Sequence, residues 1–333
     1  MVKTVRRVKI AGLGMYVPPR ILSNADLERL VETSDEWILQ RTGIRERHIV
    51  EPGVATSDIA EPAARAALED AGLKATDIGF MVVGTTTPDT MFPSTTCLLQ
   101  AKLGATKAWG FDLGAACSGF TYSLSVGWSM VATGAVEHAL VVGADVMSSI
   151  IDYTDRATCI LFGDGAGAVV LTAADDNEPA IIDFAHEIDG TGGEVLRMPA
   201  GGSRLPASHD TVNERLHYVK QDGQAVFRFA VKKSQDMAMR MLERNKLTGQ
   251  DLDLYVSHQA NRRIIEATAE RIGLPIEKVV INLDKYGNTT AATIPLALAD
   301  ARASGRLKKN DLVLLGSVGA GFTAGSVLLR WSL

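Results

Sequence analysis

"LEDAGLKATDIGFMVVG", residues 68–84, returns without a gap as "LERNKLTGQDLDLYVSH", residues 242–258. The two stretches superpose at a constant offset, pair leucine with leucine and Asp77 with Asp251, and end in apolar runs typical of buried strands. A match of this length indicates that one structural unit occurs twice in the chain. We therefore predict two similar halves, residues 1–175 and 176–333, with the polar stretch "AADDNEP" (173–179) as the joint.

Strand-like and helix-like runs alternate in both halves. Runs typical of strands buried on both faces lie at residues 80–86, 139–145, 168–173, 254–258, 312–318 and 326–331. Helical patterns lie at residues 61–72, 118–134, 231–246 and 261–273, several of them closed by glycine. This alternation predicts a layered α/β fold. Residues 186–230 are rich in Gly, Pro and polar residues, lack a counterpart in the first half, and are predicted to be an insertion over one face.

Composition excludes several classes of protein. With 46% hydrophobic and 22% charged residues among 333, the chain has the profile of a soluble globular protein. A net charge of −5 and a pI of 5.7 argue against a nucleic-acid binder. Three cysteines without CxxC spacing support neither a disulfide framework nor a zinc ribbon, and they favour a reducing cytoplasm. No apolar run approaches the ~20 residues that a membrane-spanning helix needs.

One cysteine stands in unusual surroundings, within "FDLGAACSGFTYSLSVG" (111–127). Cys117 follows a strand-like run and precedes a helix, and its neighbours are mostly Gly and Ala, which let a substrate carbonyl approach the backbone. A helix start offers free N–H groups and is expected to lower the thiol pKa. A packed core cysteine is the ordinary alternative, and we assign it to Cys97 and Cys159. Cys117 is predicted to be a nucleophile.

Two further polar residues are predicted to meet Cys117. His258 ends the apolar run "LDLYVS", at the carboxyl end of a strand, where ligand sites of α/β proteins collect. Cys117 precedes Gly134 by the same distance along the chain as Asn288 precedes Gly305, so the duplication predicts equivalent places for them near a pseudo-twofold axis. Because proline is unfavourable inside a helix, the helix after Asn288 is expected to start near Thr293. Alone, Asn288 could equally be a turn or cap residue.

Six ordered motifs resemble a known family. They are "SDEWILQRTGIRERH", "MFPST", "GAACSGFTY", "DRATCILFGDGAGAVVL", "SHQANRRI" and "KYGNTTAATIPLAL". Together they resemble β-ketoacyl-acyl carrier protein synthase III, the condensing enzyme that starts bacterial type II fatty acid synthesis. The resemblance runs from about residue 5 to the C-terminus. It implies a thiolase fold, an internally duplicated five-layer αβαβα structure, and a homodimer.

The resemblance also implies a mechanism. Cys117, His258 and Asn288 would form a catalytic triad, in which Cys117 takes an acyl group from acyl-CoA and malonyl-acyl carrier protein then loses CO₂ and attacks the thioester. His258 Nε2–H and the Asn288 amide would donate hydrogen bonds to the enolate oxygen. The backbone N–H of Cys117 and one from the turn at Gly321 would form the oxyanion hole. Neither a metal nor a cofactor is expected, apart from the CoA thioester as substrate.

Substrate contacts carry over by similarity as well. Trp37 and Arg156 would sandwich the adenine of CoA, Arg41 would lie near its phosphates, and Asn261 would line the pantetheine tunnel. Phe92 would reach the acyl pocket of a partner subunit. The residues that match the family's basic surface for the carrier protein are Arg228, Arg263 and Arg271.

The acyl pocket is where the chain departs from the family. It is predicted to include Val318 and Phe322, yet Val318 and Ala324 are smaller than the aromatic residues that members commonly have there. Either the channel accepts a primer bulkier than acetyl or a different second substrate, or neighbouring side chains fill the space.

Rival functions remain open at this point. A degradative thiolase or an elongating synthase would need a second catalytic cysteine or histidine, which the motifs do not offer. A condensing enzyme of polyketide or specialised long-chain acyl metabolism has the same triad. A non-catalytic acyl-CoA or carrier-protein binder is the alternative from another class.

Overall fold

Two sheets and the helices around them form the body of the chain. In the computed structural model, which describes residues 5–333, one sheet has the strand order β1-β7-β6-β4-β5 and the other β8-β13-β12-β11. The N-terminal half contains β1 (Arg7–Tyr16), α3 (Thr56–Ala71), β4 (Phe80–Gly84), α4 (Thr95–Leu103), β5 (Trp109–Leu113), α5 (Gly119–Ala132), β6 (His138–Asp145) and β7 (Gly165–Ala174). The C-terminal half contains β8 (Ile181–Ile188), α8 (Gly223–Arg244), β11 (Leu254–Ser257), α9 (Arg262–Arg271), α11 (Thr293–Ala303), β12 (Leu312–Gly319) and β13 (Thr323–Arg330).

The two sheets repeat each other strand by strand. The first residues of β1 and β8, of β4 and β11, and of β6 and β12 are separated by the same offset as residues 68 and 242. Pairing also agrees, since β4 with β6 and β11 with β12 are parallel, whereas β6 with β7 and β12 with β13 are antiparallel. The counterpart of β5 is reduced to one parallel bridge between Tyr255 and Val279. The offset read from the sequence therefore holds for most of the fold.

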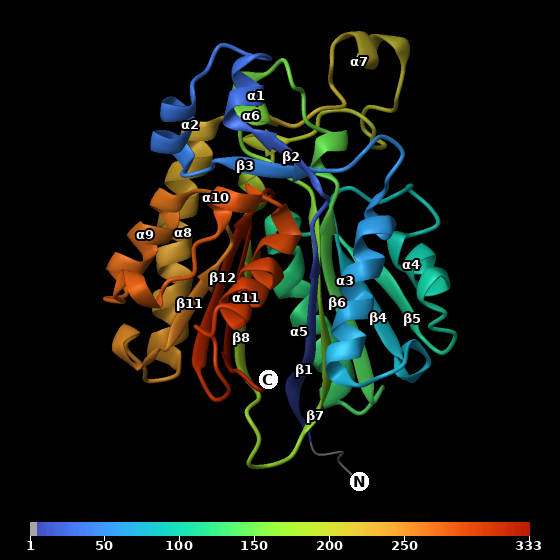
Figure 1. Cartoon of the computed structure of the whole chain (residues 1–333), viewed down its shortest axis with the longest axis vertical. Coiled ribbons are helices and arrows are strands. Elements are labelled where there is room, and N and C mark those ends of the chain that lie inside the picture. Colours follow the sequence, from blue (N-terminus) through green and yellow to red (C-terminus); the bar gives the residue numbers. More distant parts are fainter. Residues whose placement is uncertain (1–4) are drawn as a thin grey trace.

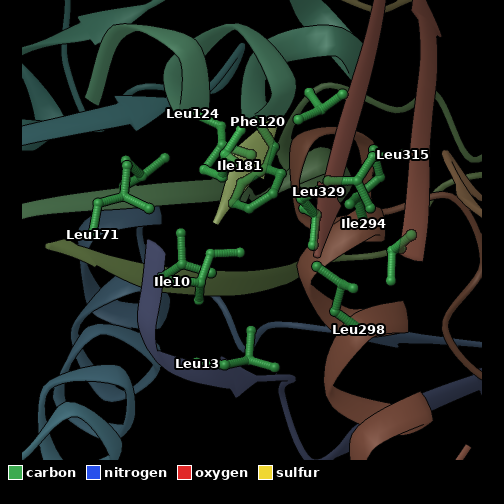
Figure 2. Packing of buried hydrophobic residues seen from close by; sticks show 14 of the residues in the cluster. Ile10, Leu13, Phe120, Leu124, Leu171, Ile181, Ile294, Leu298, Leu315 and Leu329 are labelled. Atoms are coloured by element: carbon green, nitrogen blue, oxygen red, sulfur yellow. The ribbon is translucent and has the colours of Figure 1, made fainter. Parts of the chain in front are cut away.

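The helices complete five layers, α-β-α-β-α. Helices α3 and α4 cover the outer face of the first sheet, and α8 and α9 cover that of the second (Figure 1). Helices α5 and α11 lie between the sheets, and a helix with an apolar face on both sides is expected in such a place. Phe120 and Leu124 of α5 and Ile294 and Leu298 of α11 point into a common core with residues from both sheets (Figure 2). Each such buried side chain contributes about 1.5–3 kcal/mol relative to an exposed one.

Smaller elements gather at one end of the layers, in the upper part of Figure 1. They are β2 (Arg20–Ser23), α1 (Asn24–Glu28), α2 (Asp35–Thr42), β3 (Glu46–Ile49), α6 (Arg156–Cys159), β9 (Leu196–Arg197), α7 (His209–Asn213), β10 (Lys220–Gln221) and α10 (Leu283–Tyr286). The predicted insertion, residues 186–230, begins inside β8 and ends inside α8. Its part outside these two long elements is 189–222.

One predicted equivalence is wrong. The turns that precede the central helices are Ala116–Ser118 and Thr290–Ala292, so the position equivalent to Cys117 is Ala291 rather than Asn288. The error arises because α11 has 11 residues and α5 has 14, so counting back from the closing glycines overshoots by almost one turn. Helix α11 does start at Thr293, as expected, which places Pro295 in the first turn, where proline is tolerated.

Candidate active site

Cys117 lies in the turn Ala116–Ser118, between the end of β5 and the start of α5. Ala116 adopts a φ of +47°, and Gly319 passes so close that a Cβ there would lie 2.7 Å from the backbone nitrogen of Cys117. Only glycine permits this approach of the β12–β13 hairpin. The backbone N–H groups of Cys117 and Ala320 stabilise the thiolate form of the sulfur and so act to lower its pKa. The hairpin amide at the sulfur is thus that of Ala320, one residue before the predicted Gly321.

The expected lowering of the thiol pKa is wrong for the free chain. The pKa of Cys117 is raised to about 12, chiefly by burial and also by the negative charge of Asp145, and the two backbone N–H groups offset this rise only in part. Desolvation by both sheets outweighs the effect of the helix start on the pKa, because the thiolate loses more stabilisation when it is removed from water than a few N–H groups provide. The thiol therefore needs a base at the moment of attack.

His258 follows the last residue of β11 and is 8% exposed. Its backbone N–H donates to Gly316 O at 2.7 Å, which fixes the residue beside β12. Its ring Nδ1 lies 2.7 Å from Thr293 Oγ1, so Nε2 is the nitrogen left for reactants. Burial lowers the pKa of His258 to about 3, and the imidazole is therefore neutral at physiological pH.

Asn288 is held on three sides. Its backbone N–H donates to Leu161 O at 2.9 Å, and its carbonyl accepts from Gly163 N at 3.1 Å. Its side-chain Oδ1 accepts from Thr290 N–H at 2.9 Å. Because the oxygen is taken by a backbone donor, the amide NH₂ is the end free to face the cavity, and Asn288 is a hydrogen-bond donor there.

A buried carboxylate supports the Asn288 turn. Asp145, at the end of β6, is fully buried and accepts hydrogen bonds from the hydroxyl and N–H groups of residues 85–87 with one oxygen. Its other oxygen accepts from Thr290 Oγ1 and from Ala291 N. A Cβ at Gly143 would lie 2.4 Å from Ala291 O, so glycine at this position leaves room for the turn Thr290–Ala292 to pack against the first sheet. Asp145 thereby joins the two halves next to Cys117.

The three predicted catalytic side chains line one cavity of about 680 Å³. It runs between the β12–β13 hairpin, the N-terminal part of α8 and the start of α9. Four charged residues line it, Arg41, Arg228, Arg263 and Asp222, and the last caps α8 by accepting from Gln224 N and Ala225 N. The excess of guanidinium groups suits an anionic ligand with phosphate groups.

The residues predicted to bind the nucleotide lie at one side of this cavity. Trp37 and Arg41 of α2 line it, and Arg156 lies in the neighbouring α6. The guanidinium carbon of Arg156 is 5.1 Å and that of Arg41 is 5.6 Å from the centroid of the Trp37 ring. At 5.1 Å, the space between Arg156 and the Trp37 ring is too narrow for a third ring, so the predicted sandwich requires Arg156 to move.

The other predicted contacts divide into two groups. Asn261 lines the cavity, yet its amide is already used, because Oδ1 caps α9 through Arg263 N and Nδ2 donates to Arg41 O at 2.8 Å. Arg228 and Arg263 are exposed and line the cavity, with Arg263 4.9 Å from the Phe227 ring. Arg271 is exposed at the last residue of α9 and does not line it.

The predicted acyl-pocket residues are also separated. Val318 and Phe322 line the cavity, whereas Phe92 is 86% exposed on the loop between β4 and α4. Ala324 is 2% exposed and borders a small void instead, where Phe322 stacks on Phe229 at 3.8 Å between centroids. At Ala324 the neighbouring aromatic side chains therefore fill the space, whereas Val318 lines the main cavity.

Residues 5–333 offer neither a metal cluster nor a membrane-spanning helix. No group of three or more His, Cys, Asp or Glu side chains in this range is placed to hold a metal ion. None of the helices in the same range combines the length and the apolar character that crossing a bilayer requires.

Comparison with known proteins decides the family. Residues 111–190 match the family described as 3-oxoacyl-[acyl-carrier-protein] synthase III, and residues 242–331 match its C-terminal part. β-Ketoacyl-[acyl-carrier-protein] synthase III of Koribacter versatilis is 57% identical over 330 residues, which cover 99% of both chains. The chain belongs to the β-ketoacyl-acyl carrier protein synthase III family. It is an acyltransferase and condensing enzyme of fatty acid biosynthesis, and it performs the initiating condensation.

Solved structures of the family confirm the thiolase fold. The synthase III of Pseudomonas aeruginosa is 42% identical, with a TM-score of 0.91 over 98% of this chain and 99% of that one. The priming β-ketosynthase of the R1128 polyketide pathway has the same TM-score over 100% and 98%, at 36% identity. Three solved synthase III structures, from Aquifex aeolicus, Pseudomonas aeruginosa and Thermus thermophilus, have higher identities of 41%, 42% and 40%, so polyketide synthesis remains the alternative.

Several residues of the site were not found from sequence. Thr290, Thr293 and Asp145 hold Asn288 and His258 in place, and Ala320 supplies an amide at Cys117. A signal for the threonines was present, since "NTTAAT" places three of them just before the apolar helix α11. Nothing distinguishes Ala320 in sequence, because its contribution is a backbone N–H.

Proposed function

We propose that the synthase transfers the acyl group of an acyl-CoA to Cys117 and condenses it with malonyl-acyl carrier protein. The observation that carries this proposal is that the thiol of Cys117, the imidazole of His258 and the amide of Asn288 line one cavity with an excess of arginine at its wall. The relatives are named for an acyl carrier protein substrate, and the cavity is large enough for a ligand of that class.

In the first half-reaction, Cys117 attacks the thioester carbonyl of the acyl-CoA. Its thiol proton passes to His258 Nε2 and from there to the departing CoA sulfur, so CoA leaves as the neutral thiol. The tetrahedral oxyanion would accept hydrogen bonds from the N–H groups of Cys117 and Ala320, which already face the sulfur. The product is an acyl-thioester on Cys117 with His258 neutral again.

In the second half-reaction, the malonyl group loses CO₂ and its electron pair forms an enolate. The enolate oxygen is stabilised by the NH₂ of Asn288 and by Nε2–H of His258, both neutral donors. The enolate carbon then attacks the Cys117 thioester, the carbon–sulfur bond breaks, and a 3-oxoacyl-carrier protein leaves. The thiolate of Cys117 then takes up one proton from solvent, which closes the cycle.

The arginine side chains around the cavity suggest how acyl-CoA and the carrier protein would bind. Trp37 would stack on the adenine once Arg156 turns away, and Arg41 would contact phosphate. Arg228 and Arg263, which line the cavity, would contact the phosphopantetheine and the acidic carrier protein, and Arg271 would do so further along α9. Three free cysteines support an enzyme of the reducing cytoplasm.

A homodimer is proposed from the apolar edge of the first sheet. β5 is an edge strand of this sheet, and its Trp109 and Phe111 are 53% and 39% exposed. Unpaired backbone groups of an edge strand therefore lie beside exposed apolar side chains. Phe92, on the neighbouring loop, is free to enter a second subunit. Light scattering after size exclusion should give twice the chain mass, and Trp109→Glu should lower it to that of one chain.

The small side chain of Val318 in the cavity wall leads us to propose a primer somewhat larger than acetyl. A panel of straight and branched acyl-CoA substrates should show higher kcat/KM for three to five carbons than for two. The control is Val318→Phe, which should shift the preference towards acetyl. Strict acetyl preference in the unmodified enzyme would contradict this part of the proposal.

The covalent step is tested directly. The enzyme is mixed with acyl-labelled acetyl-CoA, denatured, and digested, and the label should be found on the peptide that contains Cys117. Cys117→Ala should retain none, while Cys97→Ser serves as the matched control and should retain all of it. Label that survives in Cys117→Ala, or that is absent from the unmodified enzyme, would remove the mechanism.

A further inference from the structure

The partner of His258 is a side-chain hydroxyl. Nδ1 lies 2.7 Å from Oγ1 of Thr293, the first residue of α11, which is 2% exposed. Thr293 is close in chain to Asn288 but does not line the cavity, and it touches the chemistry only through His258. The resemblance to the family assigned it no role.

A hydroxyl differs from a backbone group because it can donate or accept. Thr293 Oγ1 has two acceptors within reach, His258 Nδ1 at 2.7 Å and Thr290 O at 3.0 Å, and it has one hydrogen to give. If that hydrogen goes to Thr290 O, then Nδ1–H donates to Thr293 and Nε2 carries a lone pair. If it goes to Nδ1, the ring proton is on Nε2.

Both arrangements leave no group unpaired. Thr290 O also accepts from the backbone N–H of Thr293, so it keeps a partner when the hydroxyl turns towards the imidazole. Nδ1 has Thr293 as its partner in either case. The free-energy difference between the two tautomers is therefore small, whereas a carbonyl or a backbone N–H as partner would enforce one of them.

The two half-reactions ask for opposite tautomers. Acyl transfer needs a lone pair on Nε2, which accepts the thiol proton of Cys117, and decarboxylation needs a hydrogen on Nε2, which is donated to the enolate oxygen. We propose that Thr293 is the positioning residue that lets His258 hold its ring proton on either nitrogen and so serve as base in one half-reaction and donor in the other. This proposal rests on the proposed function.

The proton balance closes. During acyl transfer Nε2 takes the proton of Cys117 and passes it to the CoA sulfur, which leaves Nδ1–H. Before decarboxylation the ring turns briefly towards the cavity and exchanges its proton with water there, so that the proton moves from Nδ1 to Nε2 with no net change, and the Thr293 hydroxyl turns to face Nδ1. After the condensation one proton from solvent neutralises the Cys117 thiolate, and the same exchange restores Nδ1–H. An imidazolium could not replace this exchange at neutral pH, since burial holds the pKa of His258 at about 3.

The experiment compares Thr293→Val with Thr293→Ser. Valine has nearly the shape of threonine and suits its buried place, but it offers Nδ1 no partner. The ring proton then belongs on Nε2, where the cavity can accept it. Acyl transfer, measured as single-turnover labelling of Cys117, should fall at least tenfold more than decarboxylation, measured as CO₂ release from malonyl-carrier protein by enzyme that was acylated beforehand. Thr293→Ser, which keeps the hydroxyl, should restore the balance between the two.

A second measurement does not depend on activity. In protein labelled with ¹⁵N histidine, and with His258→Gln used to assign the signals, both ring nitrogens of His258 should show shifts between the protonated and unprotonated values. Thr293→Val should show Nε2 fully protonated. One fixed tautomer in the unmodified enzyme, or equal loss of both half-reactions in Thr293→Val, would overturn the proposal. Failure of the proposed function would instead appear as absence of label on Cys117 in the unmodified enzyme.

Discussion

Replacement of Asn288 by aspartate tests the site with a change of very few atoms. The Oδ1 of Asn288 accepts from Thr290 N–H, and the backbone is fixed by Leu161 and Gly163, so aspartate can take the same place and keep the same bond. The other end changes from an NH₂ donor to an oxygen. At the position where negative charge develops in decarboxylation, a donor is lost and an acceptor replaces it.

The size of the effect follows from the number of donors. His258 and Asn288 are the two side-chain donors proposed for the enolate oxygen, and removal of one such donor costs about 2.7–4 kcal/mol, which is roughly 10²–10³ in rate. Acyl transfer uses the backbone N–H groups of Cys117 and Ala320 instead, so it should change by less than about tenfold. Burial raises the pKa of a carboxyl group, and the introduced carboxyl, once protonated, could donate again. Decarboxylation by Asn288→Asp should therefore recover in part as the pH is lowered.

The assay separates the two half-reactions, with single-turnover labelling by acyl-CoA and CO₂ release from malonyl-carrier protein on acylated enzyme. Asn288→Ala is the control, because it also lacks the donor but cannot recover at low pH. The reasoning fails if Asn288→Asp releases CO₂ at the normal rate, or if it loses acyl transfer and decarboxylation in equal measure.

Three further results are expected. Trp37→Ala should raise the KM for acyl-CoA about two- to tenfold, since a stacked ring contributes about 0.5–1.5 kcal/mol. It should leave the KM for an acyl-pantetheine without the nucleotide unchanged, and equal effects on both would place the adenine elsewhere. In a Cys97→Ser background, the rate of alkylation of Cys117, followed by mass spectrometry, should increase about tenfold per pH unit from pH 7 to 10 without a plateau. The reason is that burial raises the pKa of Cys117 to about 12 and only the thiolate reacts. A plateau near pH 8 would contradict this. Asp145→Asn should lower the free energy of unfolding in urea by about 2–3 kcal/mol, because its NH₂ would face the N–H of Ala291. It should also speed alkylation of Cys117 at fixed pH, because a negative charge that raises the thiol pKa is removed. Slower alkylation would show that Asp145 does not act on the thiol by charge.

The site residues that the sequence predicted are those whose residue type and position along the chain indicate their chemistry. Cys117 between glycines and alanines before a helix, and His258 at the end of a repeated strand, were both placed in the cavity by the structure. The equivalence of Asn288 with Cys117 was wrong because helix length is decided by packing between the sheets, and α11 closes almost one turn earlier than α5. Phe229, which stacks on Phe322, could not be predicted, because no local pattern links the two.

The sequence by itself determined the duplicated α/β framework and singled out Cys117 as the candidate nucleophile, because periodic burial and a constant repeat offset are properties of the chain read along its length. Only the tertiary structure decided how those groups behave. The thiol pKa rises because both sheets exclude water from it, the Asn288 amide is turned by one backbone N–H, and the His258 proton is shared with a threonine that the fold brings from α11. Each of these properties depends on which groups lie close together in the folded chain, because desolvation and hydrogen bonding are set by the neighbours of a group in space.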